Sequence, residues 1–210
     1  MNIKVKVSKQ PIPYKNAMKF LQKRVEKNKK GKVEDFLWIL EHPTTYTAGL
    51  RYSKSEILDK KIKIVPTNRG GKITLHNPGQ KIIYFVLNLN NKKKDIRNLI
   101  NLVEKSIIDF LKIYKIDGIA DKKNIGIWVN EKKIAAIGVR VSKWVAYHGC
   151  SINIKNSLKG YEKILPCGLD NKKITSVLNE KKISIRSVNS NLKKVFLKNL
   201  NNIYNFFFKK

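Results

Sequence analysis

The chain has 210 residues, of which 42% are hydrophobic, and its 45 Lys and Arg against 15 Asp and Glu give a formal net charge of +30. This length and hydrophobic content predict one globular domain over residues 1–210 and exclude a disordered chain. No stretch approaches the ~20 apolar residues of a membrane span, and the first residues lack the apolar core of a secretory signal. We therefore expect a cytoplasmic protein with no membrane partner.

The large positive charge by itself favours a nucleic-acid partner, but its distribution does not. Arginine occurs at only six positions, and the lysines are spread over nearly every predicted loop together with abundant asparagine and isoleucine. Nucleic-acid-binding surfaces concentrate arginine and stacking aromatic residues on one face. The lysine, asparagine and isoleucine pattern is typical of proteins from AT-rich genomes. We predict no nucleic-acid partner, and a basic RNA-binding module stays as the alternative from another functional class.

The predicted elements, in chain order, begin with a helix. Apolar residues recur at helical spacing over 14–28. A short apolar run over 36–40 predicts a buried strand, and a loop is expected over 44–51. Two short strands, 62–65 and 73–75, are expected on either side of an Arg-Gly-Gly turn.

The second half of the chain predicts further strands between two helices. A strongly apolar strand is expected over 82–89, and Asp95 is placed as the N-cap of a helix that continues to about Tyr114. Short polar connections predict hairpins between the strands that follow, and an amphipathic helix is expected over 190–208. The three strands in question are 125–129, 133–141 and 144–154. The fold class is therefore α+β, with a mixed, mostly antiparallel sheet packed against helices.

Cys167 is the strongest candidate for a catalytic residue, because it lies between a proline and a glycine in a constrained stretch of backbone. The thiolate is the reactive form of cysteine, and a nearby ammonium lowers the pKa of a thiol below its free value of about 8.5. Lys133 opens the apolar run 134–138, which predicts a buried strand, and a lysine at that position must either turn out to solvent or have a function. Lys132 points to the opposite face of such a strand. Together these features outline an acyltransferase that forms a thioester.

The other cysteine and the three histidines have simpler interpretations. Cys150 lies in an apolar strand and is expected to be a small buried side chain that lines a pocket at most; a Cys150–Cys167 disulfide is open on distance grounds but would inactivate the enzyme. His42 and His148 are expected to be hydrogen-bonded framework residues, whereas His76 is divided between a structural role and a site role. Their spacing matches no metal-binding motif, so no metal is expected.

Seven motifs in a fixed order resemble those of the lipoyl(octanoyl) transferases, which are octanoyl-[acyl carrier protein]:protein octanoyltransferases. The likeness runs from about residue 40 to residue 178. The motifs are His42-Pro43 with Tyr46-Thr47-Ala48-Gly49, Arg69-Gly70-Gly71, His76-Asn77-Pro78-Gly79-Gln80, Lys133-Ile134-Ala135-Ala136-Ile137-Gly138-Val139-Arg140, Trp144, His148-Gly149 and Pro166-Cys167-Gly168-Leu169.

The resemblance implies both a fold and an activity. The fold is that of the biotin and lipoate protein ligases, which is class II synthetase-like. The activity is transfer of an octanoyl group from octanoyl-acyl carrier protein to a lysine of lipoyl domains, in the E2 subunits of 2-oxoacid dehydrogenases and in the glycine cleavage H protein. By the family pattern, Cys167 carries the acyl thioester and Lys133 lowers its pKa. The resemblance implies no cofactor beyond the phosphopantetheine of the donor.

The family pattern also implies an acyl-binding pocket. Four positions depart from that pattern: Asn68 replaces a common aspartate, Leu75 a tyrosine or phenylalanine, Asn77 a glycine, and Ser151 a small apolar residue. The implied pocket residues are Arg69, Gly70, Gly71, Lys72, Ile73, Thr74, Leu75, His76, Ala136, Ile137, Gly138, Gly149, Cys150 and Ser151.

The main alternative activity is that of an ATP-dependent lipoate ligase of the same superfamily. Such a ligase activates a free acid as an adenylate and needs no cysteine nucleophile. The chain has no Walker phosphate loop and lacks the longer glycine run after the arginine that these ligases tend to show. The Pro166-Cys167-Gly168 motif also has no use in that reaction, so the transferase is the preferred hypothesis.

Overall fold

The computed structural model describes residues 3–90, 92, 94–166, 174–181 and 186–204. These residues form a seven-stranded sheet in the order β1-β2-β6-β10-β9-β8-β7 and a three-stranded sheet in the order β4-β3-β5. The strands of the large sheet are β1 (Ile3–Val7), β2 (Asp35–Leu40), β6 (Gln80–Asn88), β7 (Ile119–Ala120), β8 (Gly126–Val129), β9 (Lys132–Ser142) and β10 (Val145–Asn153). Those of the small sheet are β3 (Thr45–Ala48), β4 (Ile64–Pro66) and β5 (Ile73–His76).

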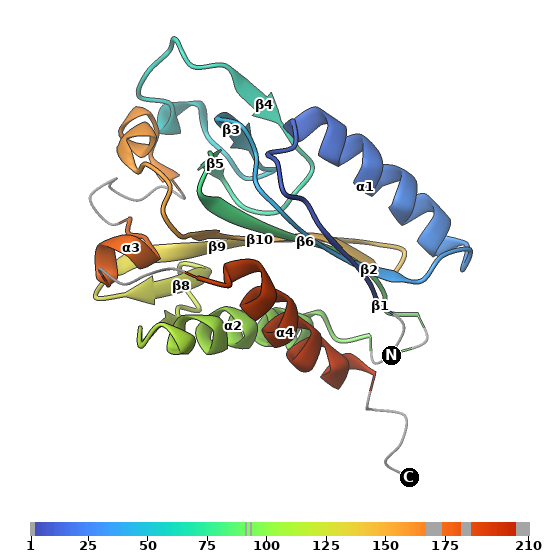
Figure 1. Ribbon diagram of the computed structural model, residues 1–210. Helices are drawn as coiled ribbons and strands as arrows, with labels where there is room; N and C mark the ends of the chain where they lie inside the picture. The colour runs from blue at the N-terminus through green and yellow to red at the C-terminus, as the bar shows by residue number, and fades with distance from the viewer. Residues whose placement is uncertain (1–2, 91, 93, 167–173, 182–185, 205–210) are drawn as a thin grey trace.

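The large sheet is antiparallel at every pairing except that of β1 with β2, which is parallel. The expected α+β class with a mixed, mostly antiparallel sheet is therefore confirmed. Strand β1 was not predicted, and it pairs with β2 at the edge of the sheet. In Figure 1, helices α2 (Ile96–Ile113) and α4 (Val188–Leu200) cover one face of the large sheet, whereas α1 (Tyr14–Lys29) and the small sheet lie on the other face.

Alternation along β2 explains why both faces of the large sheet are covered. Phe36 and Trp38 pack in a cluster with α1, whereas Leu37 and Ile39 pack in a cluster with α2 and α4. Successive side chains of a strand point to opposite faces, so a continuous apolar run requires a cover on each side. The six residues of β2 are all buried, as this arrangement requires.

The helices begin and end close to the predicted positions. The carboxylate of Asp95 accepts a hydrogen bond from the backbone N–H of Asn98 at 2.8 Å, which confirms Asp95 as the N-cap of α2. Helix α4 ends at Leu200 and continues only as a 3-10 turn over Asn201–Ile203, so the prediction of a helix to residue 208 was too long. Residues 205–210 lie outside the described part of the chain. A short helix, α3 (Val177–Glu180), was not predicted.

The expectation of a loop over 44–51 was wrong in part, because β3 lies there. Strand β3 pairs in parallel with β4 and antiparallel with β5, so both of its edges are occupied. Its partners follow it by about 20 and 30 residues, and their pairing supplies the hydrogen bonds that a short isolated strand lacks. The turn between β4 and β5 carries Arg69, Gly70 and Gly71, and the small sheet holds this turn against the large sheet.

Two-residue turns connect β8, β9 and β10. Asn130 and Glu131 have φ angles of +45° and +63°, and Lys143 and Trp144 have φ angles of +49° and +59°. Positive φ at both central residues is the pattern of type I′ turns, which suit the twist of antiparallel strands. The predicted hairpins are confirmed, with the correction that Trp144 belongs to the turn and not to the strand. Among the described residues, no helix is long and apolar enough to cross a membrane.

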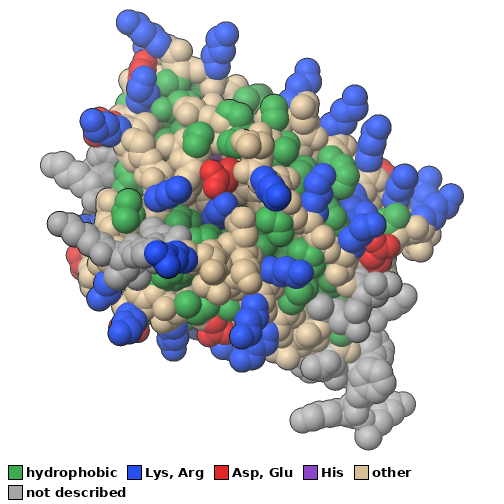
Figure 2. Space-filling view, in the orientation of Figure 1, with side chains coloured by type: hydrophobic (Ala, Val, Ile, Leu, Met, Phe, Trp, Pro, Cys, Tyr) green, Lys and Arg blue, Asp and Glu red, His purple; other side chains and the backbone are tan. Residues whose placement is uncertain are grey.

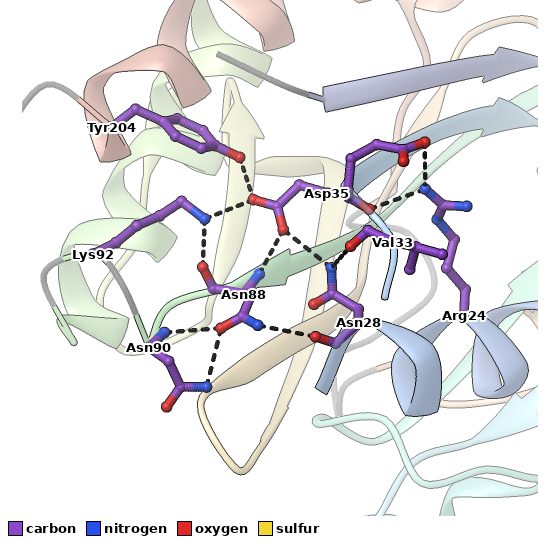
Figure 3. Close-up of polar contacts among 9 residues, drawn as sticks. Arg24, Asn28, Val33, Asp35, Asn88, Asn90, Lys92 and Tyr204 are labelled. Carbon is purple, nitrogen blue, oxygen red and sulfur yellow. Dashed lines mark hydrogen bonds and ion pairs between the residues drawn. The ribbon is translucent and has the colours of Figure 1, made fainter. Parts of the chain in front are cut away.

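A buried polar network joins Tyr204, the last described residue, to the large sheet (Figure 3). The Asp35 carboxylate accepts hydrogen bonds from the backbone N–H of Asn88 at 2.8 Å and from the side-chain amide of Asn28 at 3.3 Å. It also forms an ion pair with Lys92 at 2.7 Å and accepts a hydrogen bond from the Tyr204 hydroxyl. Several hydrogen bonds and one ion pair together compensate the burial of this carboxylate.

Candidate active site

A cavity of about 310 Å³ opens between the two sheets, on the face of the large sheet that α1 also covers. The Arg-Gly-Gly turn and β5 form one side of it, and strands β9 and β10 form the other. The predicted residues that line it are Arg69, Gly71, Lys72, Ile73, Thr74, His76, Lys133, Ala136, Ile137, Gly138, Gly149, Cys150 and Ser151. Segments that lie far apart in the sequence therefore meet at one cavity.

The register of β9 and β10 explains why two of the predicted segments lie side by side. Ala136 is opposite Ser151, Ile137 is opposite Cys150, and Gly138 is opposite Gly149. Directly opposed residues of antiparallel strands have Cβ atoms about 5 Å apart, so both segments contribute to the same wall.

Two predicted pocket residues, Gly70 and Leu75, are not part of the cavity lining. Leu75 is fully buried in a separate apolar cluster with Tyr46 and Tyr161, because its neighbours Thr74 and His76 face the cavity and alternation turns Leu75 away. Its role is packing beneath the small sheet. The substitution of an aromatic residue by Leu75 therefore does not alter the lining of the cavity.

Gly70 contributes through close backbone contact with β9. A Cβ atom on Gly70 would lie 3.0 Å from the carbonyl oxygen of Val139, and one on Gly138 would lie 3.1 Å from the carbonyl oxygen of Gly70. Both glycines thus let the turn approach the strand that forms the opposite wall. The turn is held at this distance without side chains between the two backbones.

Arg69 is anchored to the small sheet by hydrogen bonds. Its Nη2 atom donates to the backbone oxygen of Thr47 at 2.8 Å and to the Thr47 hydroxyl at 2.9 Å. Its Nη1 atom donates to the backbone oxygen of Gly70 at 3.0 Å. The guanidinium is therefore held at the wall of the cavity as a fixed positive charge, and strand β3 is the element that positions it.

The histidines around the cavity are buried and neutral. Burial lowers the pKa of His148 to about 3, with further contributions from the positive charges of Arg69 and Arg140. Burial likewise lowers the pKa of His76 to about 3 and that of His42 to about 4. Neutral imidazoles hydrogen-bond here as fixed tautomers and carry no charge near pH 7.

The three histidines have different hydrogen-bond partners, and only two of them line the cavity. His148 Nε2 donates to the side-chain oxygen of Asn68 at 2.7 Å, and His148 also lines the cavity, which the sequence analysis did not anticipate. His76 lines the cavity and donates through Nδ1 to the side-chain oxygen of Gln80 at 2.8 Å. His42 hydrogen-bonds to the backbone oxygen of Ile12 and to the Tyr84 hydroxyl behind the cavity.

We expect these three histidines to make the protein less stable in mild acid. Their pKa values in the folded state lie below the ordinary value of 6.5, so the unfolded chain binds more protons as the pH falls from about 7 to 5. The free energy of unfolding should fall by at least about 2 kcal/mol over this range, since one pKa unit corresponds to ~1.4 kcal/mol. Urea denaturation at pH 7.5 and pH 5.0 measures the change.

His42→Gln is the control for this effect, since His42 does not line the cavity. The variant should lose less stability than the parent between pH 7.5 and pH 5.0. Equal free energies of unfolding at the two pH values in the parent would contradict the assignment of buried neutral histidines.

Lys133 is 4% exposed and lies at the start of β9, whereas its neighbour Lys132 is exposed. The Lys133 ammonium donates a hydrogen bond to the backbone oxygen of Ile125 at 2.8 Å. Its backbone oxygen accepts a hydrogen bond from the Thr175 N–H at 3.0 Å, and Lys133 forms a parallel bridge with Ile174. The segment after residue 173 is thereby attached to the strand that carries this lysine.

A second, small cavity lies next to Lys133 and is lined in part by Pro166 and Ile174. These are the described residues immediately before and after the segment 167–173. Cys167 belongs to that segment, so its predicted role and its pairing with Cys150 lie outside the described residues. Lys133 nevertheless lines the same small cavity as Pro166, the residue before Cys167.

Cys150 is a free, buried cysteine whose thiol is not suited to nucleophilic attack. Burial raises the pKa of this thiol far above its usual range, so it stays protonated near pH 7. Because only the thiolate is an effective nucleophile, Cys150 is a lining residue and packs as a small apolar side chain.

Several lining residues were not identified from the sequence. Tyr84 and Ile82 reach the cavity from β6, and Arg51 follows β3. Lys123, Asn124 and Ile125 come from the turn before β8, where the Asp-Lys-Lys-Asn run is the one local sign of a turn. Arg51, Arg69, Lys72, Lys123 and Lys133 give the cavity a strongly positive lining.

The sequence of the chain matches a known protein family and several of its members. A family model of the lipoyl protein ligase A/B catalytic domain matches residues 13–197. The chain is 40% identical over 198 residues to an octanoyltransferase of Wolbachia pipientis wMel, covering 91% of this chain and 97% of that protein. It is 41% identical over 197 residues to an octanoyltransferase of Orientia tsutsugamushi strain Boryong, covering 90% of this chain and 95% of that protein.

The fold is also similar to that of a solved enzyme. A crystal structure of lipoate-protein ligase A bound with ATP has a TM-score of 0.76 to this chain at 16% sequence identity, over 96% of this chain and 86% of that one. At this identity the likeness concerns the fold alone, and it confirms the ligase-type α+β fold that the motifs imply.

Proposed function

We infer that this chain, which belongs to the octanoyltransferase family within the lipoyl protein ligase A/B catalytic domains, transfers an octanoyl group from octanoyl-acyl carrier protein to a lysine of lipoyl domains. Family membership makes it an acyltransferase. The observation that carries the mechanism is the position of Lys133, which is buried at the cavity and lines the second, small cavity together with Pro166, the residue before Cys167.

The proposed reaction has two steps. The Cys167 thiolate attacks the carbonyl carbon of the donor thioester, and the phosphopantetheine sulfur leaves and takes up a proton. The amine of the acceptor lysine then attacks the acyl-enzyme carbonyl, forms an amide and releases the Cys167 thiolate. Covalent catalysis of this kind divides one difficult transfer into two easier steps.

Lys133 has two tasks in this mechanism. Its ammonium stabilises the thiolate of Cys167 before attack, because an opposite charge nearby favours the ionised form of a thiol. When the phosphopantetheine sulfur leaves, the Lys133 ammonium gives that sulfur a proton. In the second step the resulting neutral Lys133 amine orients the incoming amine and receives the proton that this amine loses. The hydrogen bond to the Ile125 carbonyl holds its Nζ atom at the cavity throughout.

The acyl chain is proposed to occupy the cavity between the two sheets. Ile73, Ile82, Ala136, Ile137 and Cys150 are apolar residues of its lining. Burial of methylene groups contributes about 0.8 kcal/mol each, which is the term that would retain an octanoyl group. The thioester carbonyl would lie at the end of the cavity near Lys133.

We propose that the reaction needs neither ATP nor a metal ion. The energy for amide formation is already stored in the donor thioester, so no activation of a free acid is required. Phosphopantetheine, the one prosthetic group in the proposal, arrives with the donor. Among the described residues, no group of three or more His, Cys, Asp or Glu side chains is arranged to hold a metal ion.

The proposed partners are acyl carrier protein and the lipoyl domains of 2-oxoacid dehydrogenase E2 subunits and of the glycine cleavage H protein. Figure 2 shows lysine and arginine side chains over the whole visible face of the molecule, with few acidic groups among them. Such a surface attracts acidic proteins and speeds their encounter. We also propose a reducing, cytoplasmic location, because the mechanism requires Cys167 as a free thiol.

A donor-exchange assay tests this function against the ligase alternative, which the shared fold leaves open. One reaction contains the protein, an apo lipoyl domain and octanoyl-acyl carrier protein; the other contains free octanoate, ATP and magnesium in place of the donor. We expect octanoylation of the lipoyl domain, measured as a mass increase, in the first reaction alone. Labelling in the second reaction alone would establish the ligase.

A further inference from the structure

We propose that residues 121–128 form a cradle that positions the ammonium group of Lys133 at the cavity, with Gly126 and Trp128 as its positioning residues. This inference rests on the proposed function, since it assigns a role to the surroundings of the proposed catalytic lysine. The cradle consists of the turn 121–125 and the first residues of β8, which pairs with β9 beside Lys133.

Gly126 provides the space through which the Lys133 side chain passes. Its φ is +147°, and a Cβ atom there would lie 2.4 Å from Cε of Lys133 and 2.5 Å from the backbone oxygen of Ala135. The same Cβ atom would lie 3.1 Å from Lys133 Nζ. Contacts below 3 Å force one of the partners to move. The Lys133 side chain is flexible, whereas the Ala135 oxygen belongs to the backbone of β9, so a side chain here also disturbs the pairing of β8 with β9. Any side chain at residue 126 therefore displaces the ammonium.

The Ile125 carbonyl binds the ammonium group of Lys133. Lys133 Nζ donates to this backbone oxygen at 2.8 Å, a length typical of a hydrogen bond with a charged donor. The orientation of that carbonyl depends on the backbone conformation at Gly126, which only glycine adopts readily. Gly126 therefore has two roles. It leaves space for the Lys133 side chain, and its backbone conformation directs the Ile125 carbonyl toward the Lys133 ammonium.

Trp128 holds the lysine and the turn together. Lys133 Nζ lies 5.5 Å from the centroid of the Trp128 ring, within the range of a cation–π interaction. The indole Nε1 of Trp128 donates to the backbone oxygen of Asn124 at 3.0 Å. A register shift between Ile127 and Trp128 in the pairing with β9 places Trp128 opposite Lys133.

Asp121 is the first residue of the turn 121–125 and stabilises it by hydrogen bonds. Its carboxylate accepts hydrogen bonds from the backbone N–H of Lys123 at 2.7 Å and of Asn124 at 3.1 Å, as in an Asx turn. The backbone hydrogen bonds from Asn124 and Lys123 lower the pKa of Asp121, so the turn is formed with an ionised carboxylate near pH 7. This turn carries Ile125 to the cavity wall.

The pH dependence of Cys167 alkylation tests the cradle. Four variants are compared with the parent: Lys133→Ala, Gly126→Ala, Trp128→Leu and Trp128→Phe. Iodoacetamide modification of the Cys167 peptide is measured by mass spectrometry from pH 5 to pH 10. The other charged or titratable groups that line the cavity stay unchanged in every variant; they are Arg51, Arg69, Lys72, Lys123, His76, His148, Tyr84 and Cys150.

We expect the alkylation midpoint to rise by about one pH unit in Gly126→Ala and Trp128→Leu, toward the value of Lys133→Ala, because a displaced ammonium stabilises the thiolate less. Trp128→Phe keeps a ring face for the ammonium and should give a smaller rise. A purely structural role of Gly126 and Trp128 would lower thermal stability without moving the midpoint.

Matched controls separate local from general effects. Gly31 also has a positive φ, of +67°, but a Cβ atom there meets nothing within 4 Å, so Gly31→Ala should leave the midpoint unchanged. Trp38 donates through Nε1 to Ser8 at 2.9 Å within a buried cluster of the α1 side, so Trp38→Phe matches the loss of an indole hydrogen bond.

The outcomes distinguish this inference from the function on which it rests. A midpoint raised by Lys133→Ala but unchanged in both Gly126→Ala and Trp128→Leu overturns the cradle and leaves the proposed function intact. A midpoint unchanged even in Lys133→Ala overturns the proposed role of Lys133 and the cradle with it. If Gly126→Ala does not fold, the two Trp128 variants decide the result alone.

Discussion

We expect Cys167→Ala to abolish octanoyl transfer, with a loss of roughly four or more orders of magnitude in kcat/KM. In the proposed mechanism, both steps pass through a covalent bond to this sulfur, and removal of a covalent nucleophile leaves only the residual effect of binding. The measurement is octanoylation of an apo lipoyl domain with octanoyl-acyl carrier protein as donor, followed by mass spectrometry. The free energy of unfolding should change little by comparison.

Cys150→Ala is the matched control, because it removes the other thiol of the chain. Cys150 is buried and its thiol pKa is raised by burial, so its loss should lower stability by about 1 kcal/mol and keep most of the activity. If Cys150→Ala were the inactive variant and Cys167→Ala remained active, the assignment of the nucleophile would be wrong.

The second large effect is expected at Lys133. Lys133→Ala removes the buried ammonium at the cavity and should reduce kcat/KM by about 10²-fold or more, the usual scale for a group that transfers or stabilises a proton. Lys133→Met keeps a side chain of similar length without the charge. We expect it to lose as much activity as Lys133→Ala, because charge and not packing is the lost property.

Lys132→Ala changes the neighbouring lysine and provides the control. Lys132 is exposed at the start of β9, and exposed substitutions usually change stability by less than about 0.5 kcal/mol. Single-turnover acylation with octanoyl-acyl carrier protein compares the three variants with the parent. Parent-like acylation rates in Lys133→Met would show that the ammonium is not required.

The elements that were predicted correctly have strong local patterns. Helix α2 has an N-capping aspartate, Asp95, followed by apolar residues at helical spacing, and both signals depend only on neighbouring residues. The hairpins of β8, β9 and β10 likewise combine apolar runs with short polar turns. Such signals act within one element, so they can be recognised in a single sequence.

Two strands that were missed depend on distant partners. Strand β1 is an edge strand whose pairing partner β2 follows about 30 residues later, and β3 is stabilised on both edges by strands that come after it. Their own residues, Ile3–Val7 and Thr45–Ala48, bury too little surface alone to form a strand. Tertiary pairing, not local propensity, determines these two segments.

Part of the candidate site could likewise be predicted from the sequence, and part could not. Resemblance to a family brought together the segments around Arg69, Lys133 and Gly149, which the structure places at one cavity. Alternation along β5 would have separated Leu75 from Thr74 and His76, but the motif was carried over as a block. The lining position of His148 depends on a left-handed backbone with φ of +66°, which interrupts the alternation of β10 and has no local sequence signal.

Intact-mass analysis of the purified protein after incubation with octanoyl-acyl carrier protein tests the central claim most directly. The reaction contains no acceptor, no ATP and no added metal. We predict one octanoyl group per chain, lost on treatment with hydroxylamine and located by peptide mapping on the peptide that contains Cys167. An unmodified protein under these conditions, or an octanoyl group on Cys150 in place of Cys167, would contradict the account.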